Sequence, residues 1–279
     1  MSHVDVDGAQ LWVEEAGSGD DHVISCASGF DRYPAVLAEP PLSLHVLAIQ
    51  ARGFGRSTHL PEPPPEGWLD RWADDVLEVA DQRGIDRFIY TGVSHGGGVG
   101  WHLARRHPER LVALISVVGT PHDRSGDTTS SEGRRRIVAN PRDREVVAEQ
   151  FRIIGGRSDS PEQERSREAI VEQLVARTLG QTDEESRINQ GMPFPEATTN
   201  EQVADILKTI SVPVLVIAGM RDGVISPQSA LRAVTAVPHA KAVMYEEEGH
   251  FVAREHPERI ARDIGVFLQE LAPAAAAVR

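Results

Sequence analysis

The sequence is poor in cysteine, in basic residues and in long apolar runs. Cys26 is the single cysteine among 279 residues, so no disulfide can form within the chain, and its apolar surroundings predict a buried thiol. Acidic residues outnumber basic ones by 42 to 29, a net charge of −13, which argues against nucleic acid and anionic membranes as partners. No apolar run reaches membrane-spanning length, and residues 1–8 do not resemble a signal peptide. We therefore expect a cytoplasmic protein, monomeric or homodimeric, with a small-molecule substrate.

The histidines are not spaced as metal ligands. The chain has 11 of them, but no two stand as H-x-x-x-H on one predicted helix. The sequence therefore predicts no metal site, and we expect no other cofactor.

Short apolar runs alternate with amphipathic segments over much of the chain. A hairpin is predicted over residues 4–15, with its turn at Asp7-Gly8. Apolar positions over residues 69–83 follow helical spacing. Further buried strands are predicted at residues 22–28, 45–50, 87–91, 111–118, 212–219 and 240–245. Nearly continuous apolar strands that alternate with helices indicate an α/β protein with a parallel sheet covered on both faces.

Strand signals stop between residues 120 and 205. That stretch is densely charged, and three helices are predicted in it: over about 141–153, from a capping box at Ser160, and from a capping box at Thr182. Residues 123–136 are expected to form a mobile loop. We therefore predict a core of residues 1–120 and 206–279, with residues 121–205 inserted between two strands as a helical cap.

The most informative stretch is Gly92-Val93-Ser94-His95-Gly96, which joins a predicted strand to a predicted helix. A sharp turn there would lift the Ser94 hydroxyl clear of the sheet and leave that residue in a sparsely populated backbone conformation. Glycine is needed at both ends, where a side chain would collide across the turn. The alternative interpretation is a glycine-rich connection in which the serine is incidental.

Two other strand ends carry side chains that could activate Ser94. Asp222 follows the strand over residues 212–219, and His250 follows the strand over residues 240–245. The carboxyl ends of parallel strands meet at one edge of a sheet, so these groups should lie close together. A histidine can take the proton of a serine during attack, and a carboxylate fixes the tautomer of the imidazole.

Simpler interpretations of these residues remain open. His250 could be a loop histidine held by a carbonyl group, and Asp222 could serve only the start of the next helix. Asp123, just beyond the strand over residues 111–118, is a rival for the acid.

Together the motifs resemble those of capped serine hydrolases with the α/β-hydrolase fold, over about residues 4–271. The nucleophile elbow of that family resembles residues 92–96, its R-G-x-G-x-S segment resembles residues 52–57, and its acid loop resembles residues 219–227, with one extra residue before the proline. The G-H-F tail of the family matches residues 249–251. The resemblance implies a mostly parallel eight-stranded sheet with helices on both faces, and a cap inserted after the strand that follows the elbow.

The resemblance also implies roles for individual residues. Ser94 would be the nucleophile, His250 the base and Asp222 the acid. The oxyanion hole would consist of the backbone N–H groups of Phe30 and His95. The side chain of His95 is expected to line the pocket.

The sequence departs from the family pattern at two places, and a third position indicates which branches of the family it does not resemble. Ser28-Gly29 stands where the family usually has His-Gly, which puts the bracing of the oxyanion loop in question. Gln50-Ala51 stands where an aspartate often precedes R-G-x-G. Serine at position 94, in place of aspartate, argues against the haloalkane dehalogenase and epoxide hydrolase branches.

The expected activity is hydrolysis of a small carboxylic ester or lactone through an acyl-enzyme on Ser94. Related members use the same machinery for C–C bond hydrolysis, removal of an N-terminal proline, or cofactor-free oxygenase or peroxidase chemistry. A ligand-binding member without catalysis is the alternative from another class. The candidate pocket residues are Gly29, Arg32, Phe151, Met192, Phe194, Val224 and Phe251.

Overall fold

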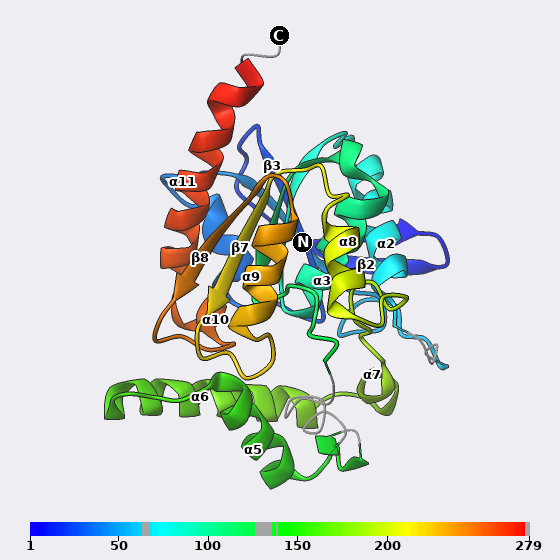
Figure 1. Ribbon diagram of the computed structural model, residues 1–279. Helices are drawn as coiled ribbons and strands as arrows, with labels where there is room; N and C mark the ends of the chain where they lie inside the picture. The colour runs from blue at the N-terminus through cyan, green and yellow to red at the C-terminus, as the bar shows by residue number, and fades with distance from the viewer. Residues whose placement is uncertain (63–66, 126–135, 138, 277–279) are drawn as a thin grey trace.

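The computed structural model describes residues 1–62, 67–125, 136–137 and 139–276. Its centre is an eight-stranded sheet with the order β1-β2-β4-β3-β5-β6-β7-β8 (Figure 1). Strand β2 is antiparallel to β1 and β4, and all the other neighbours are parallel. The predicted fold class, a mostly parallel eight-stranded sheet, is confirmed.

The strands lie where apolar and β-branched residues are concentrated. In β7, for example, all the residues are buried, as expected for a strand covered on both faces. The first two strands form the predicted hairpin, and Gly8 supplies the positive φ of 70° that its turn requires. The strands are β1 (Ser2–Val6), β2 (Ala9–Ala16), β3 (His22–Ala27), β4 (His45–Gln50), β5 (Phe88–Val93), β6 (Leu111–Val117), β7 (Val214–Gly219) and β8 (Ala240–Tyr245).

Helices cover both faces of the sheet and bury one apolar core on each (Figure 1). On one face lie α2 (Leu69–Gln82), α3 (His95–Arg106), α8 (Asn200–Leu207) and α9 (Pro227–Ala236). On the other lie α1 (Arg32–Ala35), α10 (Val252–Glu255) and α11 (Pro257–Ala276). The same part of the chain also contains two short 3₁₀ helices, η1 (Val36–Ala38) and η2 (Pro108–Arg110).

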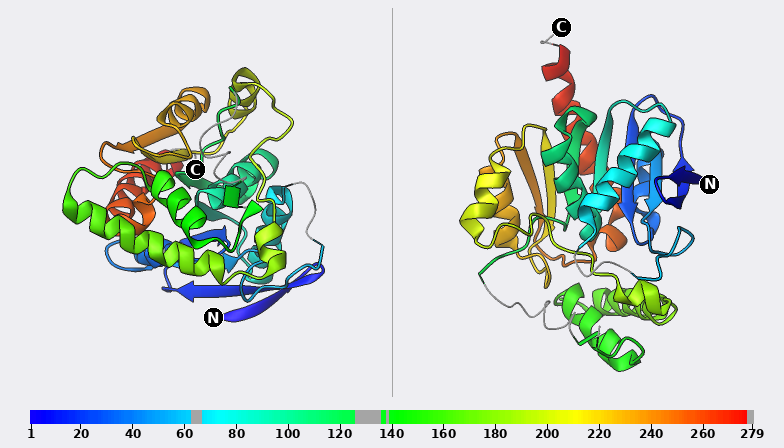
Figure 2. Two further views of the ribbon diagram at one scale, coloured as in Figure 1. Left: turned by 90° about the horizontal axis from the view of Figure 1, so that it is seen from below. Right: turned by 90° about the vertical axis from the view of Figure 1, so that its right-hand side faces the viewer.

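Three helices form a separate layer beyond the carboxyl ends of the strands (Figures 1 and 2). They are α5 (Arg144–Gly155), α6 (Pro161–Leu179) and α7 (Asp183–Arg187). Helices α5 and α6 share a small apolar cluster that includes Val147 and Val175. All three helices were predicted, and Ser160 and Thr182 cap α6 and α7 as expected. Most of the loop predicted to be mobile, residues 126–135, lies outside the described residues. We refer to α5–α7 as the cap.

Helix α8 lies inside the stretch predicted to be cap, yet it packs with the core. It begins after a capping box of Thr199 and Gln202, and it buries Val203 and Leu207 in the apolar core beside α9. The chain therefore rejoins the core helices at Asn200, before the predicted boundary at residue 206. The absence of a strand signal concealed this return because the first core element after the cap is a helix.

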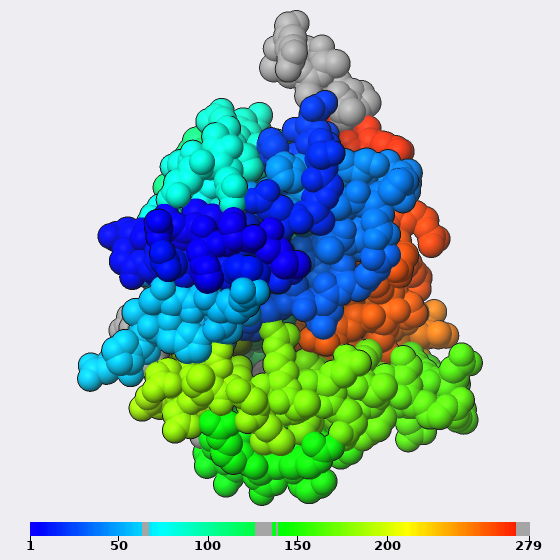
Figure 3. Space-filling model, turned by 180° about the vertical axis from the view of Figure 1, so that it is seen from behind, coloured from blue at the N-terminus to red at the C-terminus, as the bar shows by residue number. Residues whose placement is uncertain are grey.

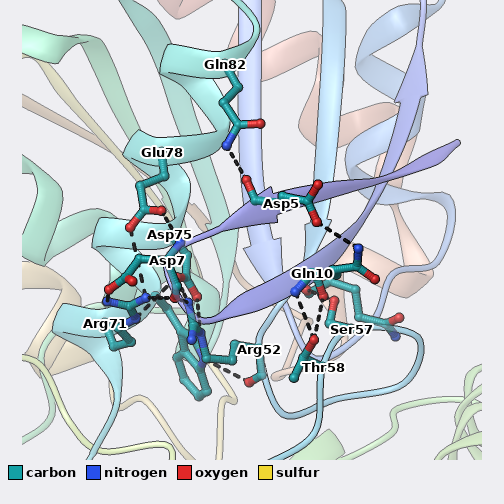
Figure 4. Close-up of polar contacts among 12 residues, drawn as sticks. Asp5, Asp7, Gln10, Arg52, Ser57, Thr58, Arg71, Asp75, Glu78 and Gln82 are labelled. Atoms are coloured by element: carbon teal, nitrogen blue, oxygen red, sulfur yellow. Dashed lines mark hydrogen bonds and ion pairs between the residues drawn. The ribbon is translucent and has the colours of Figure 1, made fainter.

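Arg52 and Ser57 connect the R-G-x-G-x-S segment to neighbouring elements of the fold by hydrogen bonds (Figure 4). Its guanidinium makes two hydrogen bonds with the buried carboxylate of Asp75 in α2, at 2.7 and 3.1 Å, and donates to the carbonyl of Asp7 at 2.7 Å. Ser57, at the end of the segment, donates to the carbonyl of Gln50 and accepts the backbone N–H of Trp12. These contacts fasten the loop after β4 to the hairpin and to α2.

The pair of Arg52 and Asp75 should be important for stability. Arg52→Met would leave the buried carboxylate of Asp75 with only the longer ion pair to Arg71, at 3.4 Å, and we expect a loss of about 3 kcal/mol in the free energy of unfolding, measured by urea denaturation. The control is Lys208→Met, which removes an exposed pair with Asp205 and should change stability little. Equal effects of the two substitutions would contradict this account.

Candidate active site

Ser94 lies in the sharp turn between β5 and α3, with φ 54° and ψ −120°. Positive φ is costly for a residue with a side chain, and it is kept here because the surrounding backbone leaves no alternative. A Cβ atom on Gly92 would collide with the backbone of Gly96, and one on Gly96 would lie 2.6 Å from the carbonyl oxygen of Cys26. The turn therefore requires both glycines and presents the Ser94 hydroxyl at the carboxyl edge of the sheet.

Ser94, His250 and Asp222 lie in one hydrogen-bonded row. The Nε2 atom of His250 is 2.9 Å from the hydroxyl of Ser94, and its Nδ1 atom is 2.8 Å from the carboxylate of Asp222. The other oxygen of that carboxylate accepts the backbone N–H groups of Val224 and Ile225, which fixes its orientation. With Nδ1–H donating to Asp222, Nε2 carries the lone pair that can take a proton from Ser94.

Asp123, the rival for the acid, points elsewhere. Its carboxylate accepts hydrogen bonds from the hydroxyl and backbone N–H of Ser125 and from the side-chain amide of Asn200, and it pairs with Arg232. The bonds from Ser125 and Asn200 hold the pKa of the Asp123 carboxyl well below its usual value. Asp222 is therefore the carboxylate that meets His250.

The loop after β3, with Ser28-Gly29-Phe30, is braced by two side chains. The backbone N–H of Ser28 donates to Nε2 of His95 at 3.2 Å, so the His95 ring supports the loop that was expected to complete the oxyanion hole. The Gln50 amide donates to the carbonyl of Ser28 at 3.2 Å and accepts the backbone N–H of Arg56. The two departures from the family pattern thus meet at this loop. The backbone donors of Phe30 and His95 stay a prediction.

Two predicted pocket residues, Phe251 and Val224, are close in sequence to members of this row. Phe251 follows His250 directly and is buried, with its ring against Gly155 at the end of α5. Phe151 is half-buried beside the same apolar cluster of the cap. Val224 is half-buried beside Asp222, whereas Met192 is 44% exposed.

Two predicted pocket residues do not face the site. Arg32 is exposed, and its guanidinium pairs with Glu39 and Glu258 on the surface. Phe194 is fully buried in the core, stacked on His102 at 5.6 Å between ring centroids. His102 lies eight residues after Ser94, about 12 Å along the axis of α3. Both residues are therefore removed from the candidate pocket.

Arg177 of α6 was not predicted, yet its guanidinium lies against the oxyanion loop. A Cβ atom on Gly29 would overlap this guanidinium, so the guanidinium occupies the space that a side chain at position 29 would fill. The side chain of Arg177 makes no hydrogen bond or ion pair with any residue that the structure describes. It borders an open cavity of about 190 Å³ together with Ser28, Gln50, Phe54, Gly55, Gly180, Gln181 and Glu185. The sequence held one signal for this placement: Arg177 stands three residues after Leu174, so it lies at the edge of the apolar stripe of α6 that faces other parts of the protein.

Other sequence predictions concern features away from this row. Cys26 is buried below the elbow, as predicted, and burial raises the pKa of its thiol well above the usual value. Within the described ranges, no three His, Cys, Asp or Glu side chains are grouped so that they could hold a metal ion. No helix in the described part of the chain combines the length and apolar character needed to cross a membrane.

The fold and this row of side chains define a class of protein. The profile of the alpha/beta hydrolase fold family matches residues 29–257. The chain belongs to this family, and it is a hydrolase of the α/β fold.

Its relatives cover several hydrolytic activities. The chain is 28% identical to the 2-hydroxymuconate semialdehyde hydrolase of Pseudomonas putida over 81% of this chain and 77% of that protein. It is 30% identical to 3-oxoadipate enol-lactonase 2 of Acinetobacter baylyi over 64% of this chain and 62% of that protein. In structure it is similar to an esterase from Thermogutta terrifontis, with a TM-score of 0.77, 23% identity, and coverage of 97% of this chain and 99% of the other.

Proposed function

We propose that this protein is a serine hydrolase that cleaves a small carboxylic ester or lactone through an acyl-enzyme on Ser94. The observation that carries the proposal is the pair of contacts at His250, 2.9 Å to the Ser94 hydroxyl and 2.8 Å to the Asp222 carboxylate. A serine hydroxyl is a poor nucleophile at neutral pH, and this arrangement is the one that activates it.

In the first step, Nε2 of His250 takes the proton of Ser94 while the serine oxygen attacks the carbonyl carbon of the substrate. The Asp222 carboxylate stabilises the imidazolium cation that forms. Negative charge develops on the carbonyl oxygen, where the backbone N–H groups of Phe30 and His95 would receive it. Donors of this kind contribute about 3–4 kcal/mol each to lowering the barrier.

In the second step, the imidazolium returns its proton to the leaving alkoxide as the C–O bond breaks. A water molecule then attacks the acyl-enzyme, with His250 again acting as the base, and Ser94 leaves as the free hydroxyl. With a lactone, the alcohol and the acid stay in one product molecule.

The guanidinium of Arg177, which is unpaired among the described residues, favours a substrate with a carboxylate group. It lies against Gly29, beside the proposed oxyanion loop, where it can pair with an anionic group near the reacting carbonyl. The substrates in the names of the two curated relatives, a muconate semialdehyde and an oxoadipate enol-lactone, are carboxylates as well. We propose that the natural substrate carries a negative charge there.

Hydrolysis of a C–C bond is the second candidate. Two semialdehyde hydrolases resemble this chain over 81% and 96% of its length, and an anion-binding Arg177 suits their acidic substrates. The two candidates differ in the leaving group, which is an alkoxide in one and a carbanion that must be protonated in the other. Turnover of a panel of esters, lactones and vinylogous diketone acids would separate them.

Ser94→Ala tests the nucleophile. We expect kcat for the best ester of the panel to fall by roughly 10³ or more, because the attacking oxygen is lost. The circular dichroism spectrum and unfolding midpoint should stay close to those of the unsubstituted protein. Near-native turnover by a folded Ser94→Ala variant would refute the proposed role.

The acid is tested by comparing two aspartates. Asp222→Asn should lower kcat by roughly two to four orders of magnitude, because the amide no longer fixes the His250 tautomer. Asp123→Asn is the matched control and should cost less than about tenfold, since its carboxylate bonds to Ser125 and Asn200. A kinetic comparison with the opposite ranking would assign the acid to Asp123.

The charge preference is tested at Arg177. Arg177→Met should raise KM for an ester with a carboxylate on its acyl part by about tenfold or more, because the ion pair is lost. KM for the neutral methyl-capped analogue should change less than about twofold. If both substrates are affected equally, Arg177 does not select for charge.

A further inference from the structure

A buried ion network joins the cap to the loop that carries His250. Arg167 of α6, whose side chain is 5% exposed, points out of the cap toward the segment between β8 and α10. Its Nη2 donates to Glu248 at 3.3 Å and to the preceding carbonyl at 3.1 Å, while Nε donates to Glu255 at 2.8 Å. Its Nη1 donates to the carbonyl of Arg157 within the cap. One cap side chain therefore holds both flanks of the His250 segment.

Glu248 extends this network to the acid loop. Its second carboxylate oxygen lies 2.8 Å from Nε2 of His256, so the carboxylate is held from two sides. Its backbone carbonyl accepts the N–H of Arg221 at 2.9 Å, and Arg221 is the residue before Asp222. The loops of the histidine and of the acid are thus tied to each other and, through Arg167, to α6.

The cap also touches both loops through bare backbone. A Cβ atom on Gly249 would collide with the carbonyl oxygen of Gly155, and one on Gly223 would lie 2.6 Å from the carbonyl oxygen of Ile153. Glycine at these positions lets the end of α5 approach without a side chain between the two surfaces. The green cap layer lies directly below the orange segment that follows β8 (Figure 3).

The charges of the Arg167 network are buried, so moving them apart is costly. The side chains of Glu248 and Glu255 are nearly as buried as that of Arg167. Burial raises the pKa of the Glu255 carboxyl, and Arg167 opposes that effect. Removing the cation of a buried ion pair strongly destabilises the folded protein, because the carboxylate stays buried without a partner. A displacement of α6 from the core would therefore disturb the loop of His250 as well.

We propose that Arg167 is a positioning residue of the site: through Glu248 and Glu255 it fixes the loop that holds His250 at hydrogen-bond distance from Ser94. The inference rests on the proposed function and adds to it that the cap aligns the catalytic pair, besides covering the substrate. Small displacements of a base from its nucleophile are costly, about 10²-fold for 1 Å.

The test measures the rate at which a small fluorophosphonate inactivates the protein by labelling Ser94. This rate depends on the alignment of Ser94 and His250 and little on a substrate pocket, because the probe is small. We expect Arg167→Met to slow labelling by roughly tenfold to a hundredfold. Arg152→Met is the matched control, since Arg152 pairs with Glu168 inside the cap and, among the described residues, makes no hydrogen bond or ion pair with either loop. It should change the rate less than about twofold.

A second variant separates positioning from stability. The triple variant Arg167→Met, Glu248→Gln, Glu255→Gln also removes the two carboxylates that Arg167→Met leaves without the Arg167 cation. Its unfolding midpoint should return to that of the unsubstituted protein, whereas labelling of Ser94 should remain slow. Recovery of both stability and labelling rate would show that Arg167 is structural only and would overturn the inference. Fast labelling of a folded Arg167→Met variant would overturn it too.

Failure of the inference can be told apart from failure of the proposed function. If the unsubstituted protein is not labelled at Ser94, the proposed nucleophile is wrong and the role of Arg167 is wrong with it. If Ser94 is labelled at the same rate with and without Arg167, the proposed function stands and the inference alone is wrong.

Discussion

The backbone turn at Ser94 is the constraint on which the arrangement of this protein depends. A residue with a side chain is held at φ 54° because β5 and α3 meet with no space between Gly92 and Gly96. The sheet supplies the rigidity for this turn: β5 lies between β3 and β6, and parallel strands continue on either side. The same edge therefore receives the loops after β7 and β8, which carry Asp222 and His250.

A second constraint is the close approach of the cap to that edge. Two of its contacts depend on glycine, Gly223 against the end of α5 and Gly249 beside Gly155, and the guanidinium of Arg177 lies against a third glycine, Gly29. Around them lie a guanidinium that is unpaired among the described residues and another that is fully engaged by buried carboxylates. The two arginines of α6 thus have different proposed duties, one toward the substrate and one toward the His250 loop.

Local chemistry explains which features could be predicted from sequence. The elbow glycines, the strand ends at Asp222 and His250, and the caps at Ser160 and Thr182 each follow from a few neighbouring residues. Features that depend on contacts between distant segments could not be predicted in this way. Phe194 is apolar in a segment without periodicity, and its burial depends on stacking against His102, 92 residues earlier. Arg167 and Arg177 acquire their roles only once α6 lies across the sheet edge.

The central claim is that an acyl group is carried by Ser94 during turnover. Rapid quenching in acid during hydrolysis of a chromogenic ester, followed by peptide mass spectrometry, tests it most directly. The account predicts a burst of the alcohol close to one equivalent per chain, and the mass of the acyl group on the peptide that contains Ser94. Turnover with the acyl group on another side chain would contradict the account, as would a burst without an adduct on Ser94.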